Sequence, residues 1–470
     1  MTMLSVRAEP TSQFRQPSNN DGPVRHGRTL RSLLIFIVLN GVVLNLAFFA
    51  VNLYLVRVNL GLKSHGTFGP LKSFATATMG TDSNAVMLSA LHIFQQNPTT
   101  SLYGMIFFQE HQKFQYPLAS LLPYYALQAA GAGDRTLIQV STVISWLSAC
   151  GVIILTAMIA LRRFPASRGL KHTATIELTV LIAGLLFYPL THSYSLGQIQ
   201  TVLTFGFAIA FYCWILDREK TAGALMGLMT LVKPQYGLFL IWAMLRKKWG
   251  AFAAGSACLA AGLLSACLVF GAHNNLDYLK VVRTISQHGE GFAANQSVNG
   301  LMNRLLFNGN NLIWDAARYA PYNSIVYFGT LVSSLTLVVL ALFYPWKARK
   351  AGAADFACCV LVSTMASPIA WEHHYAIILP VFAWLWFGDY AGGSANKSAL
   401  PIALAYILIS NDILPVSAVA QIQILNVLQS YLYLGAIIVL ALLLKSCNDR
   451  SMSIQLHTAS GGFGPDLEKA

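Results

Sequence analysis

The stretch YPLASLLPYYALQAA, residues 116–130, decides how the remainder of the chain is arranged. It is apolar, but Pro123 interrupts it, and at roughly 15 residues it is shorter than the ~20 that a helix needs to cross a bilayer. We therefore expect a re-entrant or interfacial segment that leaves the membrane on the side it entered. The next apolar run, 138–161, then returns to the cytoplasm and is followed by four basic residues: Arg162, Arg163, Arg168 and Lys171. A crossing at 116–130 would instead place them outside, against the usual inward position of positive charge.

The composition around this stretch is that of a membrane protein with many spans. The chain has 470 residues, of which 55% are hydrophobic and only 10% are charged, and its mean hydropathy is +0.55. Its long apolar runs are continuous, which indicates helices and not the alternating strands of a barrel. The net charge of +13 gathers in short connections between the runs, so it predicts no nucleic-acid partner. The seven cysteines show no CxxC spacing and predict neither disulfides nor a metal site.

We expect an all-α bundle of about twelve transmembrane helices. The predicted spans are 33–55, 138–161, 175–190, 199–216, 222–232, 236–245, 251–270, 325–344, 356–365, 375–387, 400–409 and 424–444. Several are short, as are the broken helices of polytopic proteins.

This count gives a transmembrane domain over 32–445 between two cytoplasmic tails, 1–31 and 446–470, of which the first is polar and expected to be disordered. Two large loops then lie outside, 57–115, which we expect to contain interfacial helices, and 271–321.

The same count brings a second group of polar residues together on the outer side. They are Asp82 and His92, Glu110 and His111, the segment 191–198, Lys233-Pro234-Gln235, the loop 273–319 and the segment 367–374. Ionisable groups at the ends of membrane helices usually mark a functional site. The chain contains no P-loop, no GxGxxG after a strand and no HExxH, so it offers little for nucleotide or zinc chemistry. The sequence predicts an outward-facing site of carboxylates, histidines, a lysine and an arginine.

Five short motifs follow one another along the chain. They are a lone Asp82 in the first outer loop, Tyr116-Pro117, Tyr188-Pro189 followed by Gly197-Gln198, Lys233-Pro234 after a Gly-rich helix, and Ser367-Pro368-x-x-Trp371-x-x-His374. Their order resembles the family 87 glycosyltransferases, which are C-superfamily membrane enzymes related to mycobacterial polyprenyl-phosphomannose-dependent α-mannosyltransferases. The resemblance covers residues 33–444, and its specificity lies in the joint order of the motifs.

The resemblance implies transfer of a mannose-like sugar from a polyprenyl-phosphate carrier to a lipid or glycan acceptor, at the outer face of the inner, or plasma, membrane. The implied reaction inverts the anomeric carbon and needs a carboxylate as general base, for which we select Asp82. Other acids on the same side are alternative bases: Glu110, Glu290 and Glu372. We expect no cofactor and no metal ion.

His374 is the second residue that we expect in the catalytic group. Substrate-binding roles are expected for His373, Lys233, Arg304, Gln198, Asn299, Trp371 and Glu372. The cations among them would stabilise the charge that grows on the leaving phosphate. The two amides would bond sugar hydroxyls, and the indole would offer an apolar face to a sugar ring or a prenyl unit.

Each of these residues also has a structural alternative. Asp82 precedes an apolar run and suits a helix N-cap. The pair His373-His374 suits an interfacial anchor at a helix end. Lys233 can extend from a short helix to the membrane surface, and Arg304 suits a solvated loop.

Two other functions also fit the sequence. Twelve crossings with broken helices are typical of a transporter or flippase for a lipid-linked substrate, but the two halves of the chain show no repeat, and the ionisable groups lie at helix ends. A structural or assembly protein would have no use for the outer acids and bases.

Overall fold

The computed structural model describes residues 22–58, 66–164, 169–344, 351–391, 395–413, 420 and 422–448. Within these ranges every regular element is a helix, and a single isolated β-bridge joins Asn295 to Trp371. The predicted all-α class is therefore confirmed for the part of the chain that is described. Most of each predicted tail lies outside the described residues, and so does Arg168.

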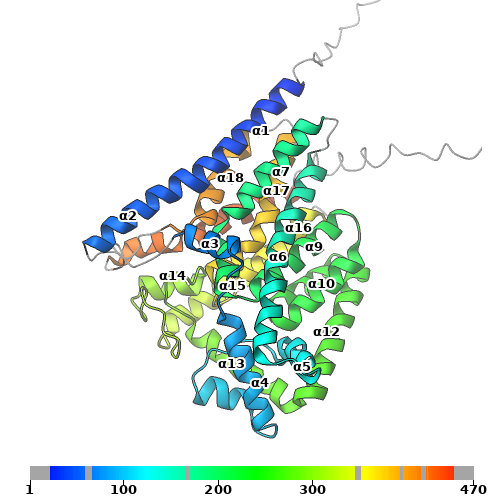
Figure 1. Ribbon diagram of the computed structural model, residues 1–470, viewed down its shortest axis with the longest axis vertical. Helices are drawn as coiled ribbons and strands as arrows, with labels where there is room; N and C mark the ends of the chain where they lie inside the picture. Colours follow the sequence, from blue (N-terminus) through cyan, green and yellow to red (C-terminus); the bar gives the residue numbers. More distant parts are fainter. Residues whose placement is uncertain are drawn as a thin grey trace, which may run out of the picture.

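A long rod opens the chain and consists of α1 (Gly22–Val38), the π-helical segment η1 (Leu39–Leu44) and α2 (Asn45–Arg57). It begins inside the segment expected to be a tail. The rod packs against α7 (Leu170–Leu185), and Figure 1 shows it beside α18 (Ala395–Ser410) as well. Hydrogen bonds fix this position: the Asn45 amide donates to Asn411 Oδ1 at 2.6 Å and the Asn40 amide donates to Ser410 at 2.9 Å.

The bundle behind the rod is built from α6 (Asp134–Arg163), α7, α8 (Tyr188–Leu196), α9 (Gln200–Ile215), α10 (Glu219–Val232), α11 (Leu238–Leu245), α12 (Trp249–Phe270), α16 (Ala353–Met365), α17 (Ile378–Ala391), α18 and α19 (Tyr431–Asn448). Aromatic side chains fill its core, where Phe356 stacks on Trp214 with ring centroids 5.3 Å apart. A buried ion pair, Arg246 Nε to Asp355 at 2.6 Å, joins α16 to the end of α11.

Five helical stretches are long and apolar enough to cross a membrane: Leu30–Tyr54, Asp134–Arg163, Trp249–Phe270, Ser324–Phe343 and Gln423–Cys447. A sixth qualifies if α7 and α8 form one span, although they are bent by 50° at the break between them. Pro189 lies in the first turn of α8, where proline is tolerated because that N–H has no helical partner. The predicted count of twelve crossings is not confirmed, because the other predicted runs correspond to shorter helices.

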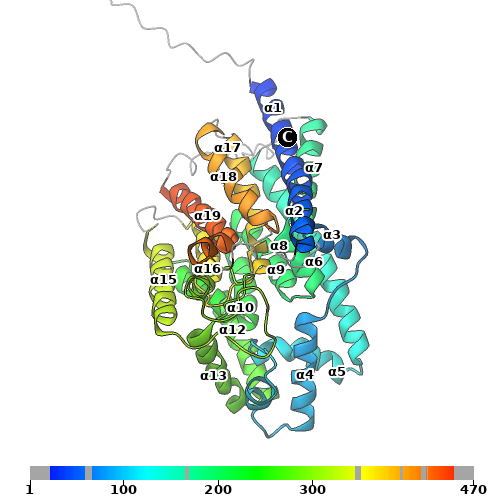
Figure 2. The ribbon, with the colours of Figure 1, turned by 90° about the vertical axis from the view of Figure 1, so that its left-hand side faces the viewer.

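Further helical elements are found between these helices along the chain. They are α3 (Phe68–Ala75), α4 (Asp82–Gln96), η2 (Gly104–Gln109), η3 (Leu118–Leu121), α5 (Leu122–Ala129), η4 (Pro234–Gly237), α13 (Ala272–His288), α14 (Val298–Leu305), α15 (Ser324–Phe343), η6 (Glu372–Ile377) and η8 (Gln423–Ser430). Figures 1 and 2 place α4, α5 and α13 at the end opposite the start of α1. The deciding stretch 116–130 forms η3 and α5, of four and eight residues, which are too short to span.

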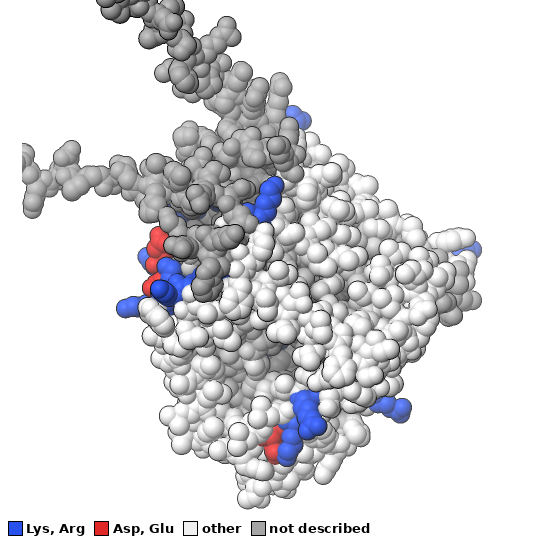
Figure 3. Space-filling view, turned by 180° about the vertical axis from the view of Figure 1, so that it is seen from behind, with Lys and Arg blue, Asp and Glu red and all other residues white. Residues whose placement is uncertain are grey.

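The surface agrees with a membrane environment. In Figure 3 the charged side chains gather toward the two ends of the visible face, and a broad uncharged band lies between them. Helices α12 and α15 expose large apolar side chains, among them Leu264, Leu268 and Val332. Such a continuous apolar surface needs lipid or another protein to cover it.

Candidate functional site

A cavity of about 1260 Å³ opens where the first loop meets the α8–α9 turn, the α10–η4 junction and η6. Seven of the nine residues expected in the site line it: Asp82, Gln198, Lys233, Trp371, Glu372, His373 and His374. These residues come from positions up to 292 apart in the sequence, so the fold, and not local spacing, brings them together.

Asp82 is the first residue of α4, and the carboxylate faces the cavity instead of capping its helix. The N-cap position is Thr81, and no side-chain cap bond forms there. Instead, the Gln198 amide donates a hydrogen bond to Asp82 Oδ2. The neighbouring protein raises the pKa of Asp82 by desolvation, and the Gln198 hydrogen bond opposes that rise. A carboxylate with a raised pKa is a stronger base, so Asp82 is suited to accept a proton.

The chain around Asp82 is held against the end of α8 by backbone hydrogen bonds. The Gly80 N–H donates to Ser195 O at 2.9 Å, and the Ser83 N–H donates to Gly197 O at 3.3 Å. Gly197 ends α8 with φ +75°, a left-handed conformation that glycine adopts without penalty. A Cβ on Gly197 would also overlap the Gly80 carbonyl oxygen. Gly197 therefore permits the close approach that fixes Asp82 next to Gln198.

Gly197→Ala should lower both stability and activity. The left-handed φ costs an alanine about 1–2 kcal/mol, and relief of the overlap moves the start of α4 away from Gln198. Thermal unfolding in detergent measures the first effect and sugar-transfer rate the second. The matched control is Gly206→Ala in α9, whose added Cβ would meet Met229 at an ordinary 3.5 Å. Equal behaviour of the two variants would contradict this role for Gly197.

Ser83 and Tyr116 fix the orientation of the Gln198 side chain. Ser83 Oγ donates to Gln198 Oε1 at 3.0 Å and lies 3.0 Å from the Tyr116 hydroxyl, and it accepts the Ile199 N–H at 3.1 Å. Because Gln198 Oε1 accepts from Ser83, its Nε2 must point toward Asp82. Burial raises the pKa of Tyr116 to about 12, so this hydroxyl stays protonated.

Lys233 contributes a buried cationic side chain to the cavity. It follows the last residue of α10 in extended backbone, before Pro234, and its side chain is 8% exposed. Its Nζ donates to Gln200 Oε1 at 2.8 Å and lies 2.6 Å from His374 Nε2. Burial lowers the pKa of Lys233 to about 7 and holds that of His374 well below its usual range. A neutral His374 can accept from the lysine, so the Lys233 ammonium points into the cavity wall and not to the membrane surface.

Glu372, the first residue of η6, is a second acid in the cavity. Glu372 accepts hydrogen bonds from the Tyr188 hydroxyl at 3.3 Å and the Tyr431 hydroxyl at 3.2 Å. Burial raises the pKa of Glu372, and the two tyrosine bonds oppose that rise. The ring of His373 lies 6.3 Å from the ring of His192 in α8. Both histidines of the pair are buried, so neither is an exposed interfacial anchor.

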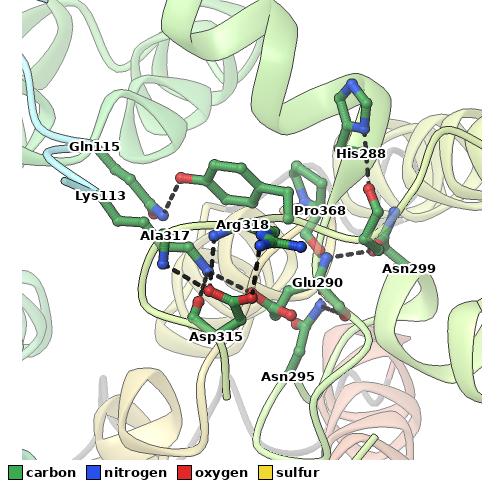
Figure 4. Close-up of polar contacts among 12 residues, drawn as sticks. Lys113, Gln115, His288, Glu290, Asn295, Asn299, Asp315, Ala317, Arg318 and Pro368 are labelled. Atoms are coloured by element: carbon green, nitrogen blue, oxygen red, sulfur yellow. Dashed lines mark hydrogen bonds and ion pairs between the residues drawn. The ribbon is translucent and has the colours of Figure 1, made fainter. Parts of the chain in front are cut away.

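Lys113, which lies in the first large loop, also lines the cavity. Its Nζ donates to Glu290 at 2.8 Å and to Asp315 O at 2.7 Å, contacts that Figure 4 draws. The same ammonium lies over the rings of Trp314, at 5.2 Å, and Tyr319, at 4.6 Å. This arrangement ties the first loop to the loop before α15. It also means that Glu290, an alternative base, is neutralised behind the wall, whereas Glu110 lines the cavity.

Two of the expected site residues do not line the cavity. Arg304 is 1% exposed and donates to the carbonyls of Phe292 and Asn295 and to Ser430 Oγ. Asn299 is fully buried and accepts from the Glu290 N–H at 3.1 Å, as Figure 4 shows. Both residues hold the loop that carries the site. Arg304 is buried, so the solvated-loop alternative does not describe it, and the substrate-binding roles of Arg304 and Asn299 stay predictions.

Other cavity residues had no signal in the sequence. Asn52 lies in α2, Asp412 follows α18, and Gln429 lies in η8. Lys113 and Trp314 lie in the loops 57–115 and 271–321. None belongs to a motif, and Asn52 lies inside a mostly apolar run. Polarity inside a membrane helix was the one available sign.

The arrangement can move a proton and stabilise an anion in one space. Asp82 supplies a base, and Lys233 supplies a cation that its neighbours leave partly desolvated. Among the described residues no three His, Cys, Asp or Glu side chains group closely enough to hold a metal ion.

The sequence profile described as "Glycosyltransferase family 87" matches residues 114–368, which is more than half of the chain. The chain is 25% identical over 226 residues to a polyprenol-phosphate-mannose-dependent alpha-(1-2)-phosphatidylinositol pentamannoside mannosyltransferase of Mycolicibacterium smegmatis; the match covers 47% of this chain and 50% of the relative. It is 24% identical over 276 residues to a polyprenol-phosphate-mannose-dependent alpha-(1-2)-phosphatidylinositol mannoside mannosyltransferase of Mycobacterium tuberculosis, covering 57% and 60%. The chain thus spans only about half of these curated relatives, and no solved structure matches it.

Proposed function

Because this chain belongs to glycosyltransferase family 87, we propose that it is a hexosyltransferase, which moves a mannose-like sugar from a polyprenyl-phosphate carrier to a lipid or glycan acceptor in the membrane. The observation that supports this most is the shared cavity: Asp82 and the Lys233–His374 pair, which are far apart in sequence, line one space. The two named relatives use a polyprenol-phosphate-mannose donor and act on phosphatidylinositol mannosides, which guides the choice of donor and acceptor.

The reaction follows from the positions of these groups. Asp82 takes the proton of an acceptor hydroxyl, and that oxygen forms a bond to the anomeric carbon while the carbon–phosphate oxygen bond breaks. Polyprenyl phosphate leaves with the electron pair, and the Lys233 ammonium stabilises its growing charge. Inversion requires attack and departure on opposite faces of the sugar, so the proposal requires the bound sugar to lie between Asp82 and Lys233.

Further groups complete the proposed site. His374 keeps Lys233 directed at the phosphate, and Gln198 orients the Asp82 carboxylate. Trp371, half-buried in the wall, offers an apolar face to a sugar ring or prenyl unit, and His373 and Glu372 continue the polar wall.

We place this cavity on the outer side of the inner, or plasma, membrane, with both termini in the cytoplasm. The support is the distribution of basic residues, which gather in the connections that the twelve-crossing count from the sequence puts inside. The five to six apolar helices of sufficient length agree with a multi-pass protein.

The test is an incubation of detergent-purified protein with radiolabelled polyprenyl-phosphate mannose, glucose and arabinofuranose, each with a membrane lipid extract. The expected result is a labelled glycolipid or glycan from one donor, with no added nucleotide sugar. Label that crosses a proteoliposome membrane without entering a new covalent product would contradict the proposal and favour a flippase.

A further inference from the structure

One short segment of the chain contacts both the proposed base and the proposed cation. Gln198 follows α8 and donates to Asp82, and Gln200, two residues later, is the first residue of α9. The Gln200 side chain is 0% exposed, and its Oε1 accepts a hydrogen bond from Lys233 Nζ at 2.8 Å. The two amides therefore act with opposite polarity, because one donates to the acid and the other accepts from the cation.

The orientation of the Gln200 amide follows from its neighbours. A lysine ammonium only donates, so the amide atom that faces Lys233 is the oxygen. The amide nitrogen then faces two hydroxyls that can accept, Thr204 Oγ1 at 3.4 Å and the Tyr236 oxygen at 3.3 Å. Thr204 lies one turn further along α9, and Tyr236 lies in η4, three residues after Lys233. The side chain is thus held at both of its polar atoms and cannot turn away from Lys233 without losing hydrogen bonds.

Gln200 and His374 together leave one N–H of the Lys233 ammonium unused. Nζ lies 2.8 Å from Gln200 Oε1 and 2.6 Å from His374 Nε2, and these are its hydrogen bonds within the described part of the chain. An ammonium has three N–H groups, and Lys233 lines the cavity. Since the nitrogen is tetrahedral, the two contacts with the protein also set the direction of the third N–H, which is left for a ligand.

The same contact supports the charge on Lys233. Burial lowers the pKa of Lys233 to about 7, whereas a hydrogen bond accepted from the charged form opposes such a fall. The titratable groups on the elements around it are His192 in α8, Tyr236 in η4, and Glu372, His373 and His374 in η6. None of them forms an ion pair with Nζ among the described residues, and Glu372 accepts from two tyrosine hydroxyls instead. The charge therefore depends on the amide oxygen of Gln200.

We propose that Gln200 is a positioning residue for the departure of the phosphate: it directs the unused N–H of Lys233 into the cavity and supports the charged form of the ammonium. Gln200 acts through Lys233 and is itself buried behind it. This inference rests on the proposed function, in which Lys233 meets the leaving phosphate. It also gives the segment 197–200 two tasks, because Gln198 orients the base and Gln200 orients the cation.

Two substitutions of Gln200 should move the pH dependence in opposite directions. Gln200→Glu places a carboxylate next to Nζ and should move the alkaline limb of kcat/KM to higher pH by about one to three units. Gln200→Met keeps the volume but removes the acceptor. Its limb should move to lower pH by about one to two units, the effect of one lost hydrogen bond to a charged group, and its kcat/KM at pH 7 should fall at least about fivefold.

The matched control is Gln296→Met. Gln296 is also a glutamine of 0% exposure, but its amide nitrogen donates to the backbone carbonyls of Ala293 and Gln429. This variant should lower the unfolding temperature and leave the alkaline limb in place. A limb that moves equally in Gln296→Met and Gln200→Met would show a general effect of a lost buried amide and overturn the role of Gln200.

A second measurement follows Lys233 without turnover. The pH dependence of trace acetylation by acetic anhydride, read by mass spectrometry of the peptide that contains Lys233, gives the pKa of this lysine in the intact protein. We expect a rise in Gln200→Glu and a fall in Gln200→Met. No shift, or shifts of the same sign, in a protein that transfers sugar would overturn the role of Gln200 alone. The expected shifts in a protein that transfers no sugar would support that role and count against the proposed function.

Discussion

Asp82→Asn is expected to lower kcat for sugar transfer by about 10²–10⁴-fold, the usual contribution of a general base. Asparagine has the same shape as aspartate, and its oxygen can still accept from Gln198, so donor affinity and the unfolding temperature should stay near those of the unchanged protein. Steady-state rates with labelled polyprenyl-phosphate sugar give kcat, and an acceptor titration gives KM.

The matched controls are the other acids of the cavity. Glu110→Gln and Glu372→Gln each remove a carboxylate that lines the same space. Glu110→Gln should retain kcat within a fewfold, and Glu372→Gln should act mainly on KM. If either control loses the reaction while Asp82→Asn keeps it, the base is not Asp82.

Lys233 should set the alkaline limb of the pH profile. Burial lowers its pKa from 10.5 to about 7, so the free enzyme loses this cation as the pH rises through 7, and kcat/KM should fall with it. The pKa of Asp82 is raised above 3.8, so kcat/KM should also fall at acid pH as that base is protonated. The profile of kcat/KM against pH is therefore expected to be bell-shaped, since it reports the free enzyme.

Two substitutions separate charge from position. Lys233→Gln should lower kcat by about 10²–10³-fold, as loss of one group that stabilises transition-state charge does. Lys233→Arg keeps a charge at every accessible pH, so its alkaline limb should disappear even if its maximal rate is lower. The control is Lys113→Gln in the same cavity. This change leaves Glu290 unpaired and should lower stability without shifting the alkaline limb of the pH profile. A limb that persists in Lys233→Arg would assign it to another group.

The sequence predicted the positions of the long and the short helices, but its count of the short ones as crossings is not confirmed. The runs 33–55, 138–161, 251–270, 325–344 and 424–444 coincide with the five helices that are long enough to span, because continuous apolar sequence has few other stable outcomes in lipid. The shorter runs do not carry that constraint. Residues 222–232 and 236–245 were counted as two crossings, yet they form α10 and α11 around the Lys233-Pro234 break.

The residues that line the cavity were also predicted only in part. Asp82 was selected from the family resemblance. Lys233 and the His373–His374 pair were selected because ionisable residues at helix ends in an apolar chain usually mark a functional site, and the fold brings all four to one cavity. Arg304 has the same appearance in the sequence, but its guanidinium binds backbone carbonyls of the loop that it supports. Asn52 and Asp412 were not selected, because their contribution depends on which neighbours α2 and α18 meet, and no local pattern records that.

The central claim is that one cavity holds the base and the leaving phosphate on either side of the sugar. A cryo-electron microscopy map of the Asp82→Asn protein with polyprenyl-phosphate mannose tests it most directly. We expect phosphate density within hydrogen-bond distance of Lys233 Nζ, with the anomeric carbon between it and residue 82. A sugar phosphate bound outside this cavity, or one with residue 82 on the same side of the sugar as the phosphate, would contradict the claim.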